Sequence, residues 1–144
     1  MRPILASSCA RAATAEEARF RIDRPIGGRA ALVVALDDDA AGVVERVAEL
    51  PWQGARFVRS GAGVPDELDS SDVAIMIGTA GADAEAASRI AAACSERGIM
   101  TAGLILGPRA EVRATIAALR PYARNLMVTD DEDDVAAVLT ALRA

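Results

Sequence analysis

Residues 73–106 read VAIMIGTAGADAEAASRIAAACSERGIMTAGLIL, and this stretch decides the fold. An apolar run at 73–77 is followed by a Gly/Thr turn at 78–81. An Ala-rich segment, 83–97, then ends at Gly98, and a second apolar run fills 99–106. A strand, a helix and a strand in this order predict a right-handed crossover between two parallel strands. Because both strands are apolar throughout, we expect helices on both faces of their sheet.

The residues before this unit predict two more strands. The run 31–36 is apolar and leads through three aspartates into a helix that ends at Leu50, before Pro51. A shorter strand is expected at 55–59, followed by a loop over 60–71 that is rich in Gly, Pro and Asp.

The residues after the unit continue the alternation. Gly107-Pro108 opens a predicted helix to Leu119, and 125–128 is the last expected strand. Thr129 with Glu132 has the spacing of a capping box, which predicts a final helix through Leu142. We therefore predict an α/β fold: a three-layer α/β/α sandwich with a mostly parallel five-stranded sheet, Rossmann-like or flavodoxin-like, in the order 2-1-3-4-5.

The chain divides into a single α/β domain, 30–144, and an N-terminal arm, 1–29. Within the arm, 4–6 is a candidate edge strand. Thr14 and Glu17 form a capping box that predicts a short helix over 15–21. Pro25, Gly27 and Gly28 then separate the arm from the domain.

The composition excludes several classes of function. The net charge of the 144 residues is −5 and the arginines form no basic stripe, so nucleic-acid binding is not expected. The chain lacks His and Lys, which rules out Ser-His-Asp catalysis, Schiff-base lysines and the usual phosphate-loop lysine. No run has the length of a membrane span, and the two cysteines, Cys9 and Cys94, form no CxxC pair. We expect a cytoplasmic protein without membrane partners.

Candidate site residues follow the predicted strands, because ligands of such sheets bind outside the carboxyl ends of the strands. The turn with Gly78, Thr79 and Gly81 is the main candidate, since glycines let the backbone approach an anion and a helix start offers free N–H groups. The other candidates for a ligand or a Mg²⁺ ion lie at the same edge. They are Gly61 and Gly63 in the second loop, Arg59 and Arg109 as counter-charges, and Asp37 and Asp38 as metal ligands.

Residues 71–108 carry a resemblance to a known family. The stretch resembles the middle of the Rossmann-like nucleotide-binding domain of the bacterial tubulin homologues, the FtsZ family. There too an apolar strand leads to a Gly/Thr loop, an Ala-rich helix and a strand of the Gly-Ile-x-Thr-x-Gly kind. The family's loop is a run of glycines followed by Thr-Gly, whereas Ala80 and Ala82 interrupt the glycines here. The resemblance implies a nucleotide at this loop.

Three functions remain open from the sequence. The first is binding of a small anionic or nucleotide-like ligand, such as a phosphate, with little or no catalysis. The second is a non-catalytic interaction domain that forms a homo-oligomer or docks on a partner, because Ala-rich helices allow close approach between subunits. The third is a transferase or hydrolase that uses Asp37 and Asp38 with Mg²⁺, or the thiol of Cys9.

Overall fold

The structure is a computed structural model that describes residues 30–61, 63–142 and 144. Its centre is a five-stranded sheet in which every pairing is parallel, in the order β2-β1-β3-β4-β5. The strands are β1 (Ala31–Ala35), β2 (Ala55–Arg59), β3 (Val73–Gly78), β4 (Met100–Leu106) and β5 (Asn125–Thr129). The predicted fold class and strand order are confirmed.

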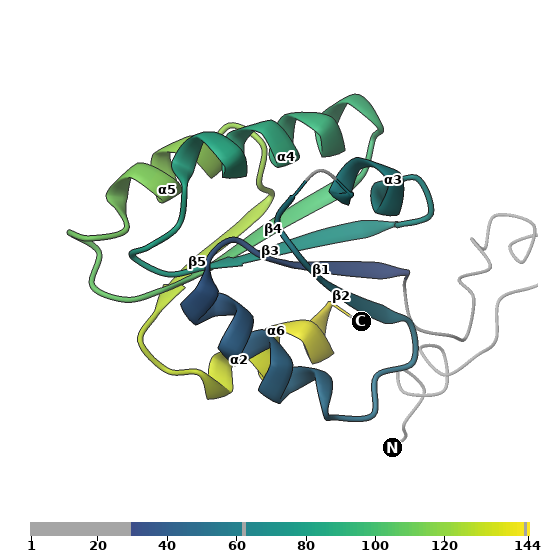
Figure 1. The fold of residues 1–144 in the computed structure, drawn as a ribbon, viewed down its shortest axis with the longest axis horizontal. Coiled ribbons are helices and arrows are strands. Elements are labelled where there is room, and N and C mark those ends of the chain that lie inside the picture. The colour runs from purple at the N-terminus through teal and green to yellow at the C-terminus, as the bar shows by residue number, and fades with distance from the viewer. Residues whose placement is uncertain (1–29, 62, 143) are drawn as a thin grey trace, which may run out of the picture.

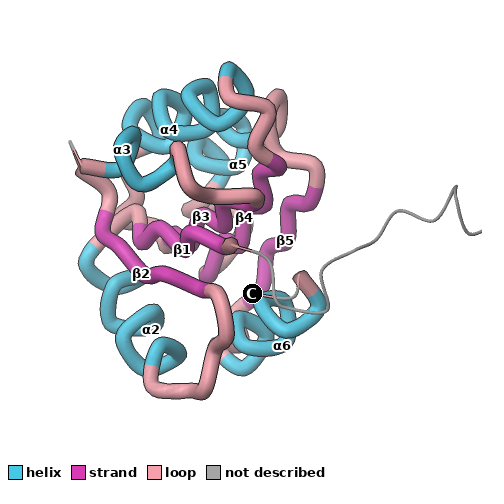
Figure 2. The backbone as a smooth tube through the Cα atoms, turned by 90° about the vertical axis from the view of Figure 1, so that its right-hand side faces the viewer, coloured by secondary structure: helices cyan, strands magenta, loops and turns pink. Residues whose placement is uncertain are grey.

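Helices cover both faces of the sheet (Figure 1). On one face lie α2 (Asp38–Ala48) and α6 (Asp133–Ala141). On the other lie α3 (Val64–Leu68), α4 (Ala84–Glu96) and α5 (Arg113–Leu119). Figure 2 views the sheet from another side and shows the same three layers, with β2 and β5 at the two edges.

The alternation of side chains along each strand divides the core into two clusters. In β1, Val33 packs with α2 and α6, while Leu32 and Val34 pack with the opposite helices. All six residues of β3 are buried, as expected for a strand covered on both faces. Complete burial of a side chain as large as Ile75 contributes about 1.5–3 kcal/mol to the stability of the fold.

Two glycines have positions that the fold requires. Gly98 ends α4 with φ +68°, and the Ile99 N–H donates to the Cys94 carbonyl at 2.9 Å, so the predicted helix end is confirmed. Gly103 of β4 lies against the α5 side of the core. A Cβ at this position would lie 2.7 Å from Leu126 Cδ1, so the sheet and its neighbours leave no room for a side chain.

Three local predictions are wrong. The expected loop over 60–71 contains α3, because Pro65 occupies the first turn and Val64 and Leu68 are buried. The helix expected from Gly107-Pro108 begins only at Arg113, after a turn in which the Glu111 N–H donates to the Pro108 carbonyl.

The third wrong prediction is the capping box at Thr129. Helix α6 begins after Glu132, whose side chain makes no capping bond, and the Asp131 carboxylate accepts from the Asp133 N–H at 2.9 Å. The Thr129 hydroxyl accepts from the Asp131 N–H at 3.1 Å and donates to Asp134. The carboxylate of Glu132 instead pairs with Arg46 of α2 at 2.8 Å. Glu132 therefore pairs with Arg46 of the neighbouring helix α2 and not with the backbone at Thr129, as a capping box would require.

The predictions for the arm, including its strand, its helix and Cys9, lie outside the described residues. Among the helices that the structure describes, none combines the length and the apolar character needed to cross a membrane.

Candidate functional site

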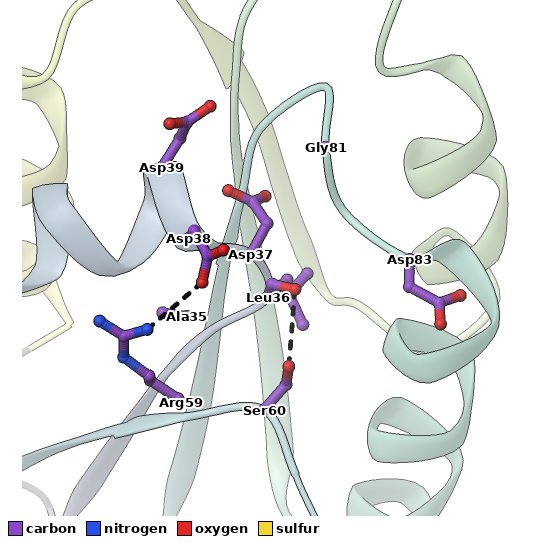
Figure 3. Close-up of a pocket in the computed structure, with 9 residues that line it drawn as sticks. All are labelled: Ala35, Leu36, Asp37, Asp38, Asp39, Arg59, Ser60, Gly81 and Asp83. Atoms are coloured by element: carbon purple, nitrogen blue, oxygen red, sulfur yellow. Dashed lines mark hydrogen bonds and ion pairs between the residues drawn. The ribbon is translucent and has the colours of Figure 1, made fainter.

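The candidate site is a crevice where the carboxyl ends of β1, β2 and β3 meet. The chain leaves β1 toward β2 on one side, whereas β3 and β4 continue on the other side, so this is the switch point of the sheet. The crevice has a volume of about 520 Å³. Its lining residues come from the end of β1, the first turn of α2, the end of β2 and the segment before α4: Ala35, Leu36, Asp37, Asp38, Asp39, Arg59, Ser60, Gly81 and Asp83 (Figure 3).

Asp37 is bound to groups of its own chain. It is the N-cap of α2, where one carboxylate oxygen accepts from the Ala40 N–H at 2.8 Å. The same carboxylate accepts from the Thr79 N–H at 2.7 Å and from the Thr79 hydroxyl at 2.9 Å. The side chain therefore links the end of β1 to the turn after β3, across 42 residues of sequence.

The turn after β3 also uses its donors internally. The Gly81 N–H donates to the Thr79 hydroxyl oxygen at 3.3 Å, and the Ala82 N–H donates to the Thr79 carbonyl at 3.1 Å. At the start of α4, the Asp83 carboxylate accepts from the N–H groups of Glu85 and Ala86. A phosphate would need these donors. Thr79 and Asp83 already accept from these four N–H groups, and Asp37 accepts from the Thr79 N–H and hydroxyl.

The charge of the crevice is acidic. Four of its lining side chains are aspartates, and Arg59 is its one basic residue. The Arg59 guanidinium lies 3.3 Å from an Asp38 oxygen and 3.2 Å from a Glu45 oxygen, and 64% of the side chain is exposed. Figure 3 shows Asp38 turned toward Arg59, while Asp83 lies apart on α4. This balance favours a cationic ligand over a phosphate.

The structure brings together part of the predicted set. Gly81, Arg59, Asp37 and Asp38 line the crevice. Thr79 reaches it through Asp37. Gly78 lies beneath, where an added Cβ would be 3.1 Å from Leu36 Cδ1, so close packing accounts for this glycine.

The other predicted residues lie elsewhere. Gly61 lines a separate groove of about 410 Å³ between α3 and α4. Gly63 is the N-cap residue of α3. Arg109 is exposed in the turn after β4 and is not one of the residues that line the crevice.

Ser60 and Asp83 are crevice residues that the prediction of the site did not include. Ser60 follows the end of β2, and its N–H continues the ladder by donating to the Ala35 carbonyl at 2.8 Å. Asp83 directly precedes α4. Ser60 follows a predicted strand and Asp83 starts a predicted helix, as the other candidates do, so the same reasoning from the sequence could have included both.

Metal and thiol chemistry find little support within the described ranges. No group of three or more Cys, Asp or Glu side chains there is arranged to hold a metal ion. Cys94 lies on the buried face of α4, and desolvation raises the pKa of its thiol, which disfavours the reactive thiolate.

The fold and the switch-point crevice together define a doubly wound, Rossmann-like α/β domain. No protein-family model matches the sequence, and neither does any curated protein. Among solved structures, the chain is similar to a de novo designed protein determined by solution NMR. The TM-score is 0.54 at 16% identity, over 78% of this chain and 88% of the designed one. This likeness shows the fold alone.

Proposed function

We propose that the domain is a non-catalytic interaction domain, whose function is contact with another protein chain. The observation that carries this proposal is the state of the switch point, where folds of this kind bind their ligands. The Asp37 carboxylate accepts from the N–H and hydroxyl of Thr79, and Asp83 accepts from the N–H groups of Glu85 and Ala86 in the first turn of α4. The chain thus supplies its own anions where a phosphate or nucleotide would bind.

The local charge supports the same conclusion. A phosphate in the crevice would meet four aspartates and one arginine, which already has two acidic partners. Repulsion by uncompensated carboxylates opposes an anion, and nothing in the described set of side chains offsets it. The acidic lining therefore disfavours the nucleotide that the resemblance of 71–108 to the FtsZ family implies.

A second candidate function is small-ligand binding in the crevice itself. Its position at the switch point and its volume of about 520 Å³ favour this function. The charge then points to an amine or guanidinium ligand instead of the anionic ligand expected from the glycines. The hydrolase or transferase hypothesis, with Asp37, Asp38 and Mg²⁺, belongs to the same crevice and stays a prediction, as does a catalytic Cys9.

A thermal-shift panel on the full chain separates these functions. The panel comprises GTP, GDP, ATP, FMN, NAD, sugar phosphates and phosphate, each with and without Mg²⁺, together with spermidine and arginine. A ligand at about 100 times its Kd adds roughly 2.7 kcal/mol of stability, enough to raise the unfolding midpoint of such a domain by several degrees. We expect no shift.

Two variants make the panel decisive. A shift that Gly81→Asp changes (lost for an anion, larger for spermidine or arginine) and that Gly61→Asp leaves unchanged would assign the ligand to the crevice and overturn the interaction proposal. The pair is matched, because both glycines are exposed and neither has an atom within 3.5 Å of an added Cβ. A shift that requires Mg²⁺ and disappears in Asp38→Asn would favour the enzyme hypothesis instead.

A further inference from the structure

The two edges of the sheet differ in their protection against pairing with another chain. Strand β2 carries Arg56 and Arg59, and Arg56 is tied to α3 and the turn after it through Glu67 and Ser71. Strand β5 reads NLMVT and contains no charged residue and no proline. Charged side chains and prolines are the usual means by which natural edge strands avoid pairing. Only β2 has such protection.

Strand β5 also offers free backbone groups. Within the described residues it pairs only with β4. The Thr129 carbonyl accepts from the Gly107 N–H at 2.9 Å, so Thr129 faces β4. Because backbone direction alternates along a strand, Met127 and Asn125 also face β4, and Leu126 and Val128 direct their N–H and C=O groups outward.

The side chains of β5 are only partly covered. Leu126 and Val128 pack against the α5 side of the core and remain partly exposed. Met127 points to the other face and is 45% exposed, one of two large apolar residues with such exposure among the described residues. An exposed apolar side chain in the middle of an uncharged edge strand is a feature of a strand that pairs with another.

We infer that a second copy of this chain pairs with β5 in antiparallel fashion, about a two-fold axis at Met127, to form a continuous ten-stranded sheet. The inference rests on the proposed interaction function and names its partner. In this register the outward-facing Leu126 lies opposite Val128 of the second copy, so the two exchange backbone hydrogen bonds. Met127 then packs against its own symmetry mate.

The charges at the ends of β5 favour this partner and this direction. Arg124 directly precedes the strand and Asp130 directly follows it, and both are exposed. In the antiparallel register each Arg124 lies opposite Asp130 of the second copy. A parallel arrangement in register would place like charges opposite each other instead. The strand thus carries at its two ends charges that are complementary to those of its own reversed copy.

Sedimentation of the full chain over a roughly hundredfold range of concentration tests the inference. We expect a concentration-dependent dimer, and Met127→Lys should raise its Kd at least about tenfold, because lysine on an edge opposes strand pairing. Leu50→Lys is the matched control, because Leu50 is 48% exposed but lies after α2, away from β5. The dimer Kd of this variant should equal that of the parent chain. Circular dichroism checks that both variants remain folded.

Two further measurements test the register of the paired strands. Arg124→Asp and Asp130→Arg should each weaken the dimer, and the double variant should restore it. In a chain with both cysteines changed to serine, Met127→Cys should cross-link with its own copy under mild oxidation, because directly opposed residues of a non-hydrogen-bonded pair lie about 4.5 Å apart at Cα. Ala137→Cys, exposed on α6, should not.

The outcomes separate this inference from the proposed function. A chain that stays monomeric at every concentration, with no cross-link at position 127, overturns the dimer, and this includes the case in which residues 1–29 cover β5. The interaction function then stands or falls by the ligand panel. A dimer that Met127→Lys and the charge exchange leave unchanged overturns the β5 interface alone.

Discussion

Replacing Asp37 by alanine tests whether this side chain is structural. The substitution removes the N-cap of α2, which contributes about 1 kcal/mol. It also removes the two hydrogen bonds from Thr79, at 2.7 and 2.9 Å. Hydrogen bonds to a charged group contribute about 1.5–3 kcal/mol each, and the half-buried setting and the shared carboxylate reduce their sum. We expect Asp37→Ala to lower the free energy of unfolding by about 2–4 kcal/mol.

Urea unfolding followed by circular dichroism measures this loss, with the slope of the transition unchanged. Asp37→Asn keeps neutral acceptors and should lose roughly half as much. Asp38→Ala is the matched control, because within the described residues its fully exposed side chain pairs with Arg59 alone, at 3.3 Å, and its unfolding midpoint should stay close to that of the parent chain.

A neutral or stabilising Asp37→Ala would refute the reasoning. An unpaired carboxylate that a protein retains for a ligand or a metal costs stability, so its removal raises the free energy of unfolding. That result would return Asp37 to the role of metal ligand that the sequence suggests. A loss in the expected range would leave the interaction proposal in place.

Three other predictions follow from packing. Gly103→Ala should lower the free energy of unfolding in urea by about 1–3 kcal/mol, because the added Cβ would overlap Leu126. Gly61→Ala should be nearly neutral, because no atom lies within 4 Å of a Cβ added there. In a Cys9→Ser background, iodoacetamide should modify Cys94 much more slowly in the native chain than in urea, since burial raises its thiol pKa; equal rates would contradict this. Arg56→Ala should lower the free energy of unfolding by about 1–2 kcal/mol, as its hydrogen bonds to the Glu67 carboxylate and carbonyl and to the Ser71 hydroxyl join β2 to the α3 region; an unchanged midpoint would contradict this.

The sheet could be predicted from the sequence because its strands carry their own signal. Runs such as 73–77 are apolar without interruption, and only a strand covered on both faces needs this. The alternation with helices then predicts right-handed crossovers, and 2-1-3-4-5 is a common strand order of sheets built in this way. Helix α3 could not be predicted in the same way. It has five residues, and its stability comes from burying Val64 and Leu68 against the core, which no local pattern shows.

The site could be predicted in position but not in chemistry. Strand ends located Asp37, Arg59 and Gly81 in one crevice. The sequence did not show that Asp37 would reach Thr79 across 42 residues, because such a contact depends on the register of β1 against β3. The failed capping box has the same cause: Glu132 pairs with Arg46, which is 86 residues away.

Glycines in a switch-point turn suggest a phosphate only if they leave backbone donors free. In this chain Gly78 is accounted for by packing against Leu36, since its absent side chain leaves room for the end of β1. The N–H groups of Thr79 and Gly81 donate to Asp37 and to the Thr79 hydroxyl oxygen, and the Ala82 N–H donates to the Thr79 carbonyl. An anion would therefore have to displace a carboxylate that is covalently attached and already in place. The attached carboxylate has the advantage in this competition, because a free anion loses translational entropy on binding and the Asp37 carboxylate already lost its own on folding. The same glycines that suggested a ligand thus fit a turn that binds its own chain, and the open strand β5 is where contacts with other molecules are expected.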